Sequence, residues 1–194
     1  MKYLLSLLLF PLSLFGTINI DVIGDSITMG AGATDFYGYM DMLQHRFGVE
    51  DKDIQLHNRA YGGAKTDTLA AIGITAITFD HPDYILIFLG TNDCLANMPQ
   101  ATLLANFQAM MSKCTPNCKR IILGGVNSNL MNPSYNYVLA AVYGSLITSY
   151  NPYPVMLMGT DVLAHCPDSI HPDDIGHQMI ADNLYNVFHV LGLY

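Results

Sequence analysis

Three residues at opposite ends of the chain have the types that acyl transfer requires. Ser26 follows an apolar run in "VIGDS", and a serine hydroxyl becomes nucleophilic when a base removes its proton. His171 is the candidate base, because an imidazole titrates near neutral pH. Asp168, three residues earlier in "DSIH", can accept a hydrogen bond from the other ring nitrogen and stabilise the imidazolium. We therefore predict Ser26, Asp168 and His171 as catalytic residues.

The negative charge that develops on an acyl oxygen needs hydrogen-bond donors that are fixed in advance. The segment "NRAYGGAKT" contains the pair Gly62 and Gly63, and glycine lets the backbone approach a substrate closely. The segment "GTND" supplies the side-chain amide of Asn92, whereas we interpret its Asp93 as structural. We expect an oxyanion hole made of the backbone N–H groups of Ser26 and one of these glycines, together with the Asn92 amide.

These residues can meet only if they follow the strands of one sheet. Short apolar runs alternate with segments of helical period, which predicts a parallel sheet with helices on both faces. The predicted strands are 17–23, 53–58, 84–90, 120–126 and 153–159, and the predicted helices are near 36–48, 65–78, 100–113, 134–150 and 173–190. Ligands of such folds bind beyond the carboxyl ends of the strands, and every candidate residue directly follows a predicted strand.

Four motifs in this order, "GDS", "NRAYGGAKT", "GTND" and "DSIH", resemble those of the SGNH (GDSL) hydrolase superfamily over roughly residues 18–190. The resemblance implies a three-layer α/β/α sandwich with a flavodoxin-like, five-stranded parallel sheet of order 2-1-3-4-5. It also implies a serine esterase mechanism without metal or cofactor. Alignment on Asn58 and Thr66 assigns the glycine of the second motif to Gly63 rather than Gly62. The layout is similar to small exported bacterial lysophospholipase, thioesterase and arylesterase members.

Other interpretations of the same residues remain. Ser26 could be a helix N-cap, and Asp168 could cap the last helix instead of orienting His171. His165, Cys166, His171 and His177 form a cluster, but their spacing lacks an i, i+4 histidine pair, so no metal site is predicted. The segment "GAGATD" lacks the full G-x-G-x-x-G pattern, so no dinucleotide cofactor is predicted.

The N-terminus, "MKYLLSLLLFPLSLFG", has one Lys followed by an uncharged apolar run and Gly16. This layout predicts a cleaved signal peptide over residues 1–16 and a single domain over 17–194. A membrane anchor would need about 20 apolar residues and would consume the first predicted strand. We therefore expect an exported, periplasmic or secreted protein without stable membrane insertion after cleavage.

The four cysteines, at positions 94, 114, 118 and 166, suit an exported protein, in which disulfides persist. Cys114 and Cys118 could close a small loop, and a bridge between Cys94 and Cys166 could join two loops near the predicted site. Four cysteines allow three pairings. We expect structural disulfides and leave their pairing open.

The formal net charge is −8, with 16 acidic residues against eight basic ones, which disfavours nucleic-acid binding. The expected function is hydrolysis of carboxylic esters or thioesters, of lipids or small molecules, through an acyl-Ser26 intermediate. One alternative is a deacetylase of O-acetylated polysaccharide or peptidoglycan that uses the same residues. Another is a binding module that recognises an acyl ligand without turnover. The sequence leaves the acyl length, the alcohol and the oligomeric state open.

Overall fold

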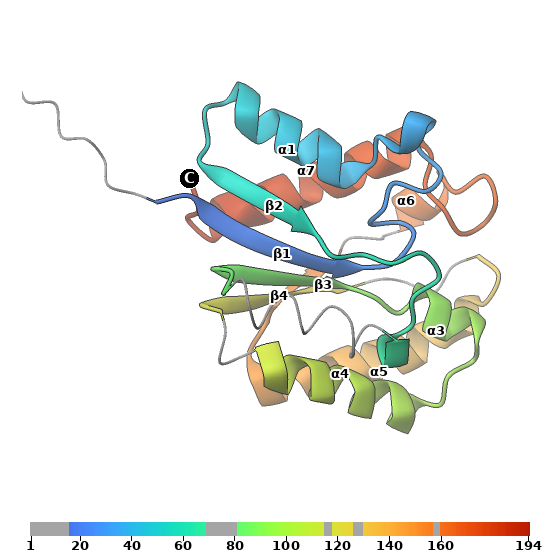
Figure 1. The fold of residues 1–194 in the computed structure, drawn as a ribbon. Coiled ribbons are helices and arrows are strands. Elements are labelled where there is room, and N and C mark those ends of the chain that lie inside the picture. Colours follow the sequence, from blue (N-terminus) through green and yellow to red (C-terminus); the bar gives the residue numbers. More distant parts are fainter. Residues whose placement is uncertain (1–15, 69–80, 115–117, 126–129, 157–159) are drawn as a thin grey trace, which may run out of the picture.

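The structure, a computed structural model, describes residues 16–68, 81–114, 118–125, 130–156 and 160–194 (Figure 1). Five strands pair in parallel in the order β2-β1-β3-β4-β5. They are β1 Ile18–Gly24, β2 Ile54–Asn58, β3 Tyr84–Phe88, β4 Arg120–Gly125 and β5 Tyr153–Met156. The parallel α/β fold predicted from the sequence is confirmed.

Helices lie on both faces of the sheet, with α1 and α7 on one side and α4 and α5 on the other (Figure 1). Their bounds are α1 Tyr39–Val49, α3 Thr91–Leu95, α4 Gln100–Cys114, α5 Asn136–Tyr150, α6 Thr160–Leu163 and α7 Asp174–Val190. Two 3-10 turns, η1 Thr34–Phe36 and η3 Pro133–Tyr135, precede α1 and α5. Within the described ranges, every helix is too short or too polar to pass through a bilayer.

The apolar runs form the core because the sheet is covered on both faces. In β3, residues 85–88 are each at most 1% exposed, as expected of a central strand. The edge strand β2 alternates instead, with Ile54 and Leu56 buried and Gln55 exposed. On the α1–α7 side, Phe47 stacks on Phe188 with ring centroids 6.0 Å apart. This packing joins α1 to α7 near their C-terminal ends, at the edge of the sheet away from the site.

Several predicted boundaries move in the structure. The helix predicted near 36–48 begins at Tyr39, because Asp35 and Phe36 have the left-handed φ values of 53° and 57°. The helix predicted near 65–78 lies mostly outside the described residues, and only 66–68 are seen to be helical. The short helices α3 and α6 are additional to the prediction. The predicted signal peptide lies outside the described residues except for Gly16.

The expectation of structural disulfides is wrong for this structure, in which all four cysteines carry thiols. The Cys94 sulfur lies 3.7 Å from the backbone oxygen of Asn132, and the Cys166 sulfur lies 3.5 Å from that of Val162. The thiols of Cys94 and Cys166 therefore contact two different backbone carbonyls and do not form a bridge with each other. Burial raises the pKa of Cys114 to about 12 and that of Cys166 to about 11, which keeps both thiols protonated at neutral pH.

Candidate active site

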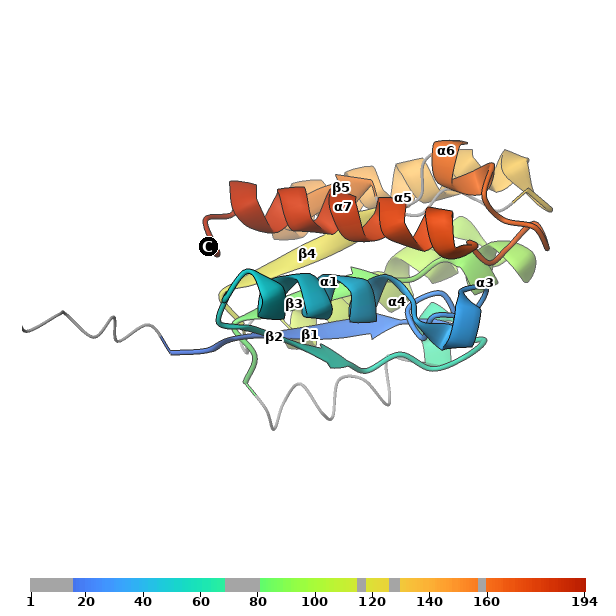
Figure 2. The same ribbon diagram turned by 90° about the horizontal axis from the view of Figure 1, so that it is seen from above.

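The loops that follow β1, β2 and β3 lie at one end of the sheet (Figure 2). There Ser26, His171 and Asp168 form a continuous chain of contacts, although Ser26 and His171 are 145 positions apart. The Oγ atom of Ser26 lies 2.9 Å from Nε2 of His171. The Nδ1 atom of His171 lies 2.6 Å from Oδ2 of Asp168. The three predicted catalytic side chains are thus within hydrogen-bonding distance of one another.

These contacts determine which ring nitrogen carries the proton. Partial burial opposes ionisation of Asp168, but hydrogen bonds from the backbone and the ring of His171 hold the pKa of the carboxyl below its ordinary value. A carboxylate can only accept, so Nδ1 of His171 must be the protonated nitrogen that donates to it. The lone pair of Nε2 then faces the hydroxyl of Ser26. This is the tautomer that can take a proton from the serine.

Two local features hold His171 in place. Asp168 also accepts hydrogen bonds from the backbone N–H groups of Ile170 and His171, at 2.9 and 2.6 Å, so its carboxyl anchors the turn and the ring together. From the other side, Gly32 packs against this turn. A Cβ atom at position 32 would lie 2.2 Å from the backbone oxygen of Pro172 and 3.0 Å from Cβ of His171. The alternative role of Asp168 as a helix cap is wrong, because Asp173 caps α7 by accepting from Gly176 N at 2.9 Å.

The side chain of Asn92, in the first turn of α3, reaches toward the loops after β1 and β2. Its Nδ2 donates to the backbone oxygen of Ala64 at 3.1 Å and to Oδ2 of Asp25 at 3.2 Å. These bonds join the "GTND" motif to the neighbours of both Ser26 and Gly63. An amide nitrogen has two protons. Donation to an oxyanion therefore requires the Nδ2 of Asn92 to exchange one of these acceptors for the substrate oxygen.

Asp25 is a buried acid of the site that the sequence analysis did not single out. Its carboxyl is buried next to Ser26 in the sequence, and its Oδ1 accepts from the backbone N–H of Ile27 at 3.0 Å. Burial raises the pKa of Asp25 to about 7, although the Ile27 hydrogen bond and the nearby His171 counteract this effect. The signal was present in the sequence, since an acid that ends an apolar run directly before Ser26 must be buried with a partner.

Gly63 lies in an exposed turn after β2, with a φ of 73° that favours glycine. The turn is fixed to the end of β1 by a hydrogen bond from Tyr61 N to Gly24 O at 3.1 Å. A Cβ atom at position 63 would meet nothing within 4 Å, whereas one at Gly62 would lie 3.7 Å from Sδ of Met29. Gly62 thus lies next to Met29 of the Ser26 loop, and Gly63 follows it in the same turn.

Comparison with known proteins assigns this arrangement to a family. Residues 22–179 match the GDSL-like lipase/acylhydrolase family. The chain belongs to this family. As a GDSL-like acylhydrolase, the protein is an ester-bond hydrolase. Esterase TesA of Pseudomonas aeruginosa is 25% identical over 169 residues, which cover 84% of each chain.

Solved structures share the fold of this GDSL-like hydrolase. The psychrotrophic esterase EstA from Pseudoalteromonas sp. has a TM-score of 0.78 at 21% identity, over 90% of this chain and 98% of its own. The crystal structure of TesA has a TM-score of 0.74 at 22% identity, over 89% and 99% of the two chains. Axe2, an acetylxylan esterase from Geobacillus stearothermophilus, has a TM-score of 0.74 at 18% identity, over 88% and 94%.

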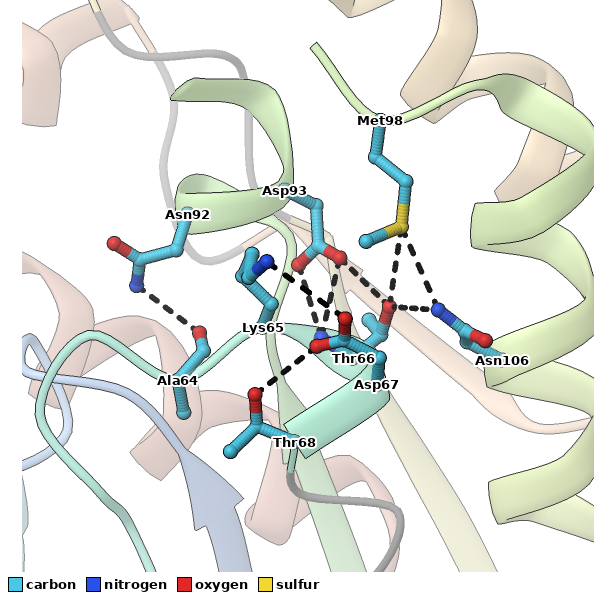
Figure 3. A network of polar contacts seen from close by, with 9 residues as sticks. All are labelled: Ala64, Lys65, Thr66, Asp67, Thr68, Asn92, Asp93, Met98 and Asn106. Atoms are coloured by element: carbon cyan, nitrogen blue, oxygen red, sulfur yellow. Dashed lines mark hydrogen bonds and ion pairs between the residues drawn. The ribbon is translucent and has the colours of Figure 1, made fainter. Parts of the chain in front are cut away.

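In this GDSL-like hydrolase, a buried polar network fixes the turn with Gly63 against α3 (Figure 3). The carboxyl of Asp93 accepts from the backbone N–H of Thr66 at 3.1 and 3.2 Å and from its hydroxyl at 2.7 Å. The Thr66 hydroxyl in turn accepts from Nδ2 of Asn106 at 3.0 Å. Burial raises the pKa of Asp93 even though the bonds from Thr66 lower it. These contacts agree with a structural role for Asp93.

His177, which lies six residues after His171, is buried in the hydrolase rather than turned to solvent. Its Nδ1 accepts from the backbone N–H of Tyr39 at 3.2 Å, so its Nε2 carries the proton and donates to Ala31 O at 3.1 Å. Burial lowers the pKa of His177, which keeps the ring neutral. His177 therefore ties α7 to the loop that follows Ser26.

The histidine and cysteine cluster noted in the sequence is divided among separate contacts. Nδ1 of His165 lies 3.4 Å from Oδ2 of Asp173, while His171 and Cys166 have the partners given above. Among the residues that the structure describes, no three histidine, cysteine or carboxylate side chains are grouped so that they could hold a metal ion.

Proposed function

We propose that the protein is an exported serine esterase that hydrolyses carboxylic esters or thioesters through an acyl-Ser26 intermediate. The observation that carries this proposal is the chain of contacts from Ser26 Oγ through His171 to Asp168, at 2.9 and 2.6 Å. Family membership supports ester hydrolysis itself. The esterase TesA adds support, because it is similar over most of both chains.

In the first half of the proposed reaction, Nε2 of His171 accepts the Ser26 hydroxyl proton while Oγ attacks the acyl carbon. The carbonyl oxygen of the substrate becomes an oxyanion, for which the N–H groups of Ser26 and Gly63 and the amide of Asn92 are the proposed donors. The imidazolium then protonates the leaving alcohol or thiol as its bond to the acyl carbon breaks. Asp168 stabilises the imidazolium throughout.

In the second half, a water molecule gives a proton to Nε2 of His171 and attacks the acyl carbon of acyl-Ser26. Collapse of this intermediate returns the proton to Oγ of Ser26 and releases the carboxylic acid. The acetylxylan esterase Axe2 offers a parallel. Catalytic mutants of Axe2 carry substitutions at a serine, an aspartate and a histidine, and the last two lie three positions apart, as Asp168 and His171 do.

The test of this proposal is the Ser26→Ala variant. We expect it to lose hydrolysis of p-nitrophenyl butyrate and labelling by a fluorophosphonate probe, while its thermal unfolding stays close to that of the parent protein. An alanine variant that keeps full activity would overturn the assignment of the nucleophile. A parent protein that is neither labelled by the probe nor active on any ester would favour a binding module instead, because only an activated serine is labelled.

The substrate class and the export remain parts of the proposal with their own tests. Hydrolysis rates measured against acyl lengths from C2 to C16 separate a lipid esterase from a polysaccharide deacetylase, since the deacetylase is confined to acetyl esters. For export, we propose that residues 1–16 are removed and that 17–194 form the mature domain. Sequencing the N-terminus of the mature protein tests this, with Thr17 as the expected first residue.

A further inference from the structure

The exposed apolar side chains of the protein are concentrated at the site end of the sheet. Among the described residues, the exposed large apolar side chains lie in the loops and first helical turns at the carboxyl edge of the strands, with the exceptions of Val49, Ile147 and Val190. These three lie toward the C-terminal ends of α1, α5 and α7, at the opposite edge. Scattered surface apolar residues are ordinary, but such a one-sided distribution marks an interaction surface.

Six of these side chains, which we call the apolar rim, lie on segments that carry Ser26 or His171 or that are hydrogen-bonded to the loops of these residues. They are Met29, Phe36, Tyr61, Leu130, Met131 and Ile175. Leu130 donates its backbone N–H to Ser169 O at 3.3 Å, directly beside Asp168. Met29 is three residues from Ser26, and its Sδ would lie 3.7 Å from a Cβ at Gly62, next to Tyr61. The rim therefore adjoins the proposed nucleophile, base and oxyanion glycines.

Phe36 is the most informative residue of the rim. It is 67% exposed, so packing does not hold it, and its φ of 57° is a conformation that aromatic residues rarely adopt. The turn is nevertheless fixed, because Asp174 accepts from the backbone N–H and the hydroxyl of Thr34 at 2.7 and 2.8 Å. These two hydrogen bonds also bring Ile175, in the first turn of α7, next to the turn that contains Phe36. An exposed aromatic on a fixed, unfavourable turn is best explained by an external contact.

We propose that the apolar rim docks the enzyme onto a zwitterionic lipid surface, so that esters in that surface reach Ser26. This inference rests on the proposed function and names the physical state of its substrate. A protein partner on the rim would cover the nucleophile and prevent turnover, whereas a surface that contains the substrate would deliver it. Side chains such as Phe36 and Ile175 can insert among lipid headgroups while the polar backbone stays in water.

The charge of the protein favours a zwitterionic lipid surface over an anionic one. The chain carries a formal net charge of −8, and exposed Asp35 and Asp174 stand directly beside Phe36 and Ile175. Anionic headgroups would be repelled by these carboxylates, so electrostatics cannot assist docking on an acidic membrane. Docking must depend on apolar insertion, which zwitterionic headgroups permit. Binding should consequently respond weakly to salt.

The test compares two double variants of the full mature protein. Phe36→Asn with Ile175→Gln removes two rim side chains, and asparagine tolerates the left-handed turn at position 36. The matched control, Val49→Gln with Val190→Gln, removes two exposed apolar side chains at the opposite edge. The measurements are cosedimentation with phosphatidylcholine vesicles, hydrolysis of soluble p-nitrophenyl butyrate, and hydrolysis of a long-chain ester carried in the same vesicles.

We expect the rim variant to bind vesicles at least tenfold more weakly and to hydrolyse the vesicle-borne ester correspondingly more slowly. Its rate on the soluble ester should stay within about twofold of the parent rate, and the control should match the parent in all three assays. Equal vesicle binding by the rim variant would overturn the proposal, as would tighter binding to phosphatidylglycerol vesicles. An equal loss on soluble and vesicle-borne esters would also overturn it.

The same assays separate this inference from the proposed function. The Ser26→Ala variant should bind phosphatidylcholine vesicles as the parent does while hydrolysing neither ester. If the parent protein binds the vesicles through the rim yet hydrolyses no ester, then the esterase proposal fails while the docking surface stands. If it hydrolyses soluble ester but does not bind the vesicles, only the docking surface fails.

Discussion

The Oδ2 atom of Asp168 accepts from Nδ1 of His171 and thereby determines which nitrogen of the ring carries the proton. In an Asp168→Asn variant, the side-chain oxygen can keep the two backbone hydrogen bonds now made by Oδ1, at 2.9 and 2.6 Å. The amide nitrogen then faces Nδ1 and forces the ring proton onto Nε2, which can no longer accept a proton from Ser26. We expect kcat for p-nitrophenyl butyrate to fall by about 10⁴-fold with little change in thermal stability. A fall of less than tenfold would mean that Asp168 does not orient the base.

Asn92 is the proposed side-chain donor of the oxyanion hole, and its removal should act on the transition state. We expect Asn92→Ala to lower kcat by about 100-fold or more and to change KM much less. The control is Asn186→Ala, on the exposed part of α7. Steady-state kinetics on a soluble ester measure the effect. An unchanged kcat would remove Asn92 from the oxyanion hole.

Between elements, the Asp93–Thr66 network determines how the Gly63 turn sits relative to α3 (Figure 3). Thr66→Val keeps the side-chain shape but removes the hydroxyl that donates to Asp93 at 2.7 Å and accepts from Asn106 at 3.0 Å. Asp93 then loses a buried hydrogen bond and Asn106 a partly buried one, which costs about 1–3 kcal/mol. We expect a lower free energy of unfolding in urea and also a lower kcat, because the turn carries the proposed oxyanion glycine.

Thr68 provides the matched control for this substitution. Its hydroxyl donates to Asp67 at 3.0 Å, but both residues are exposed, so Thr68→Val should change the free energy of unfolding by less than about 0.5 kcal/mol. Equal effects at positions 66 and 68 would contradict the view that the buried network positions the turn.

Across the whole molecule, the features that could be predicted are those with local signals. The run at 84–88 is apolar at every position, which allowed the parallel sheet to be predicted. Each motif comes after a strand, which allowed the contact between Ser26 and His171 to be predicted. The contact between Asp25 and Asn92 joins loops 67 positions apart, and neither motif reveals it alone. The burial of His177 likewise depends on Ala31 and Tyr39, which its position along α7 does not indicate.

The buried titratable groups also make the stability of the whole fold depend on pH. Burial raises the pKa of Asp25 from its ordinary 3.8 to about 7, so between these values the folded chain holds a proton that the unfolded chain has lost. The contribution to stability is complete below about pH 3.8 and is lost as the pH rises to about 7. His177 acts in the opposite direction, because burial lowers its pKa and its contribution is lost as the pH falls.

Asp25→Asn isolates the first of these effects. The substitution also weakens the hydrogen bond with Asn92, but that loss shifts the free energy of unfolding by a similar amount at every pH. Relative to the parent, the variant should gain up to about 1.4 kcal/mol for each pH unit between pH 5 and 7, measured by urea unfolding. The control is Asp41→Asn on the exposed surface of α1, which measures the general effect of replacing a carboxylate by an amide. A difference that stays constant from pH 5 to 7 in the Asp25 variant would mean that this carboxyl is ionised throughout, with Asn92 donating to a permanent charge beside the proposed nucleophile, Ser26.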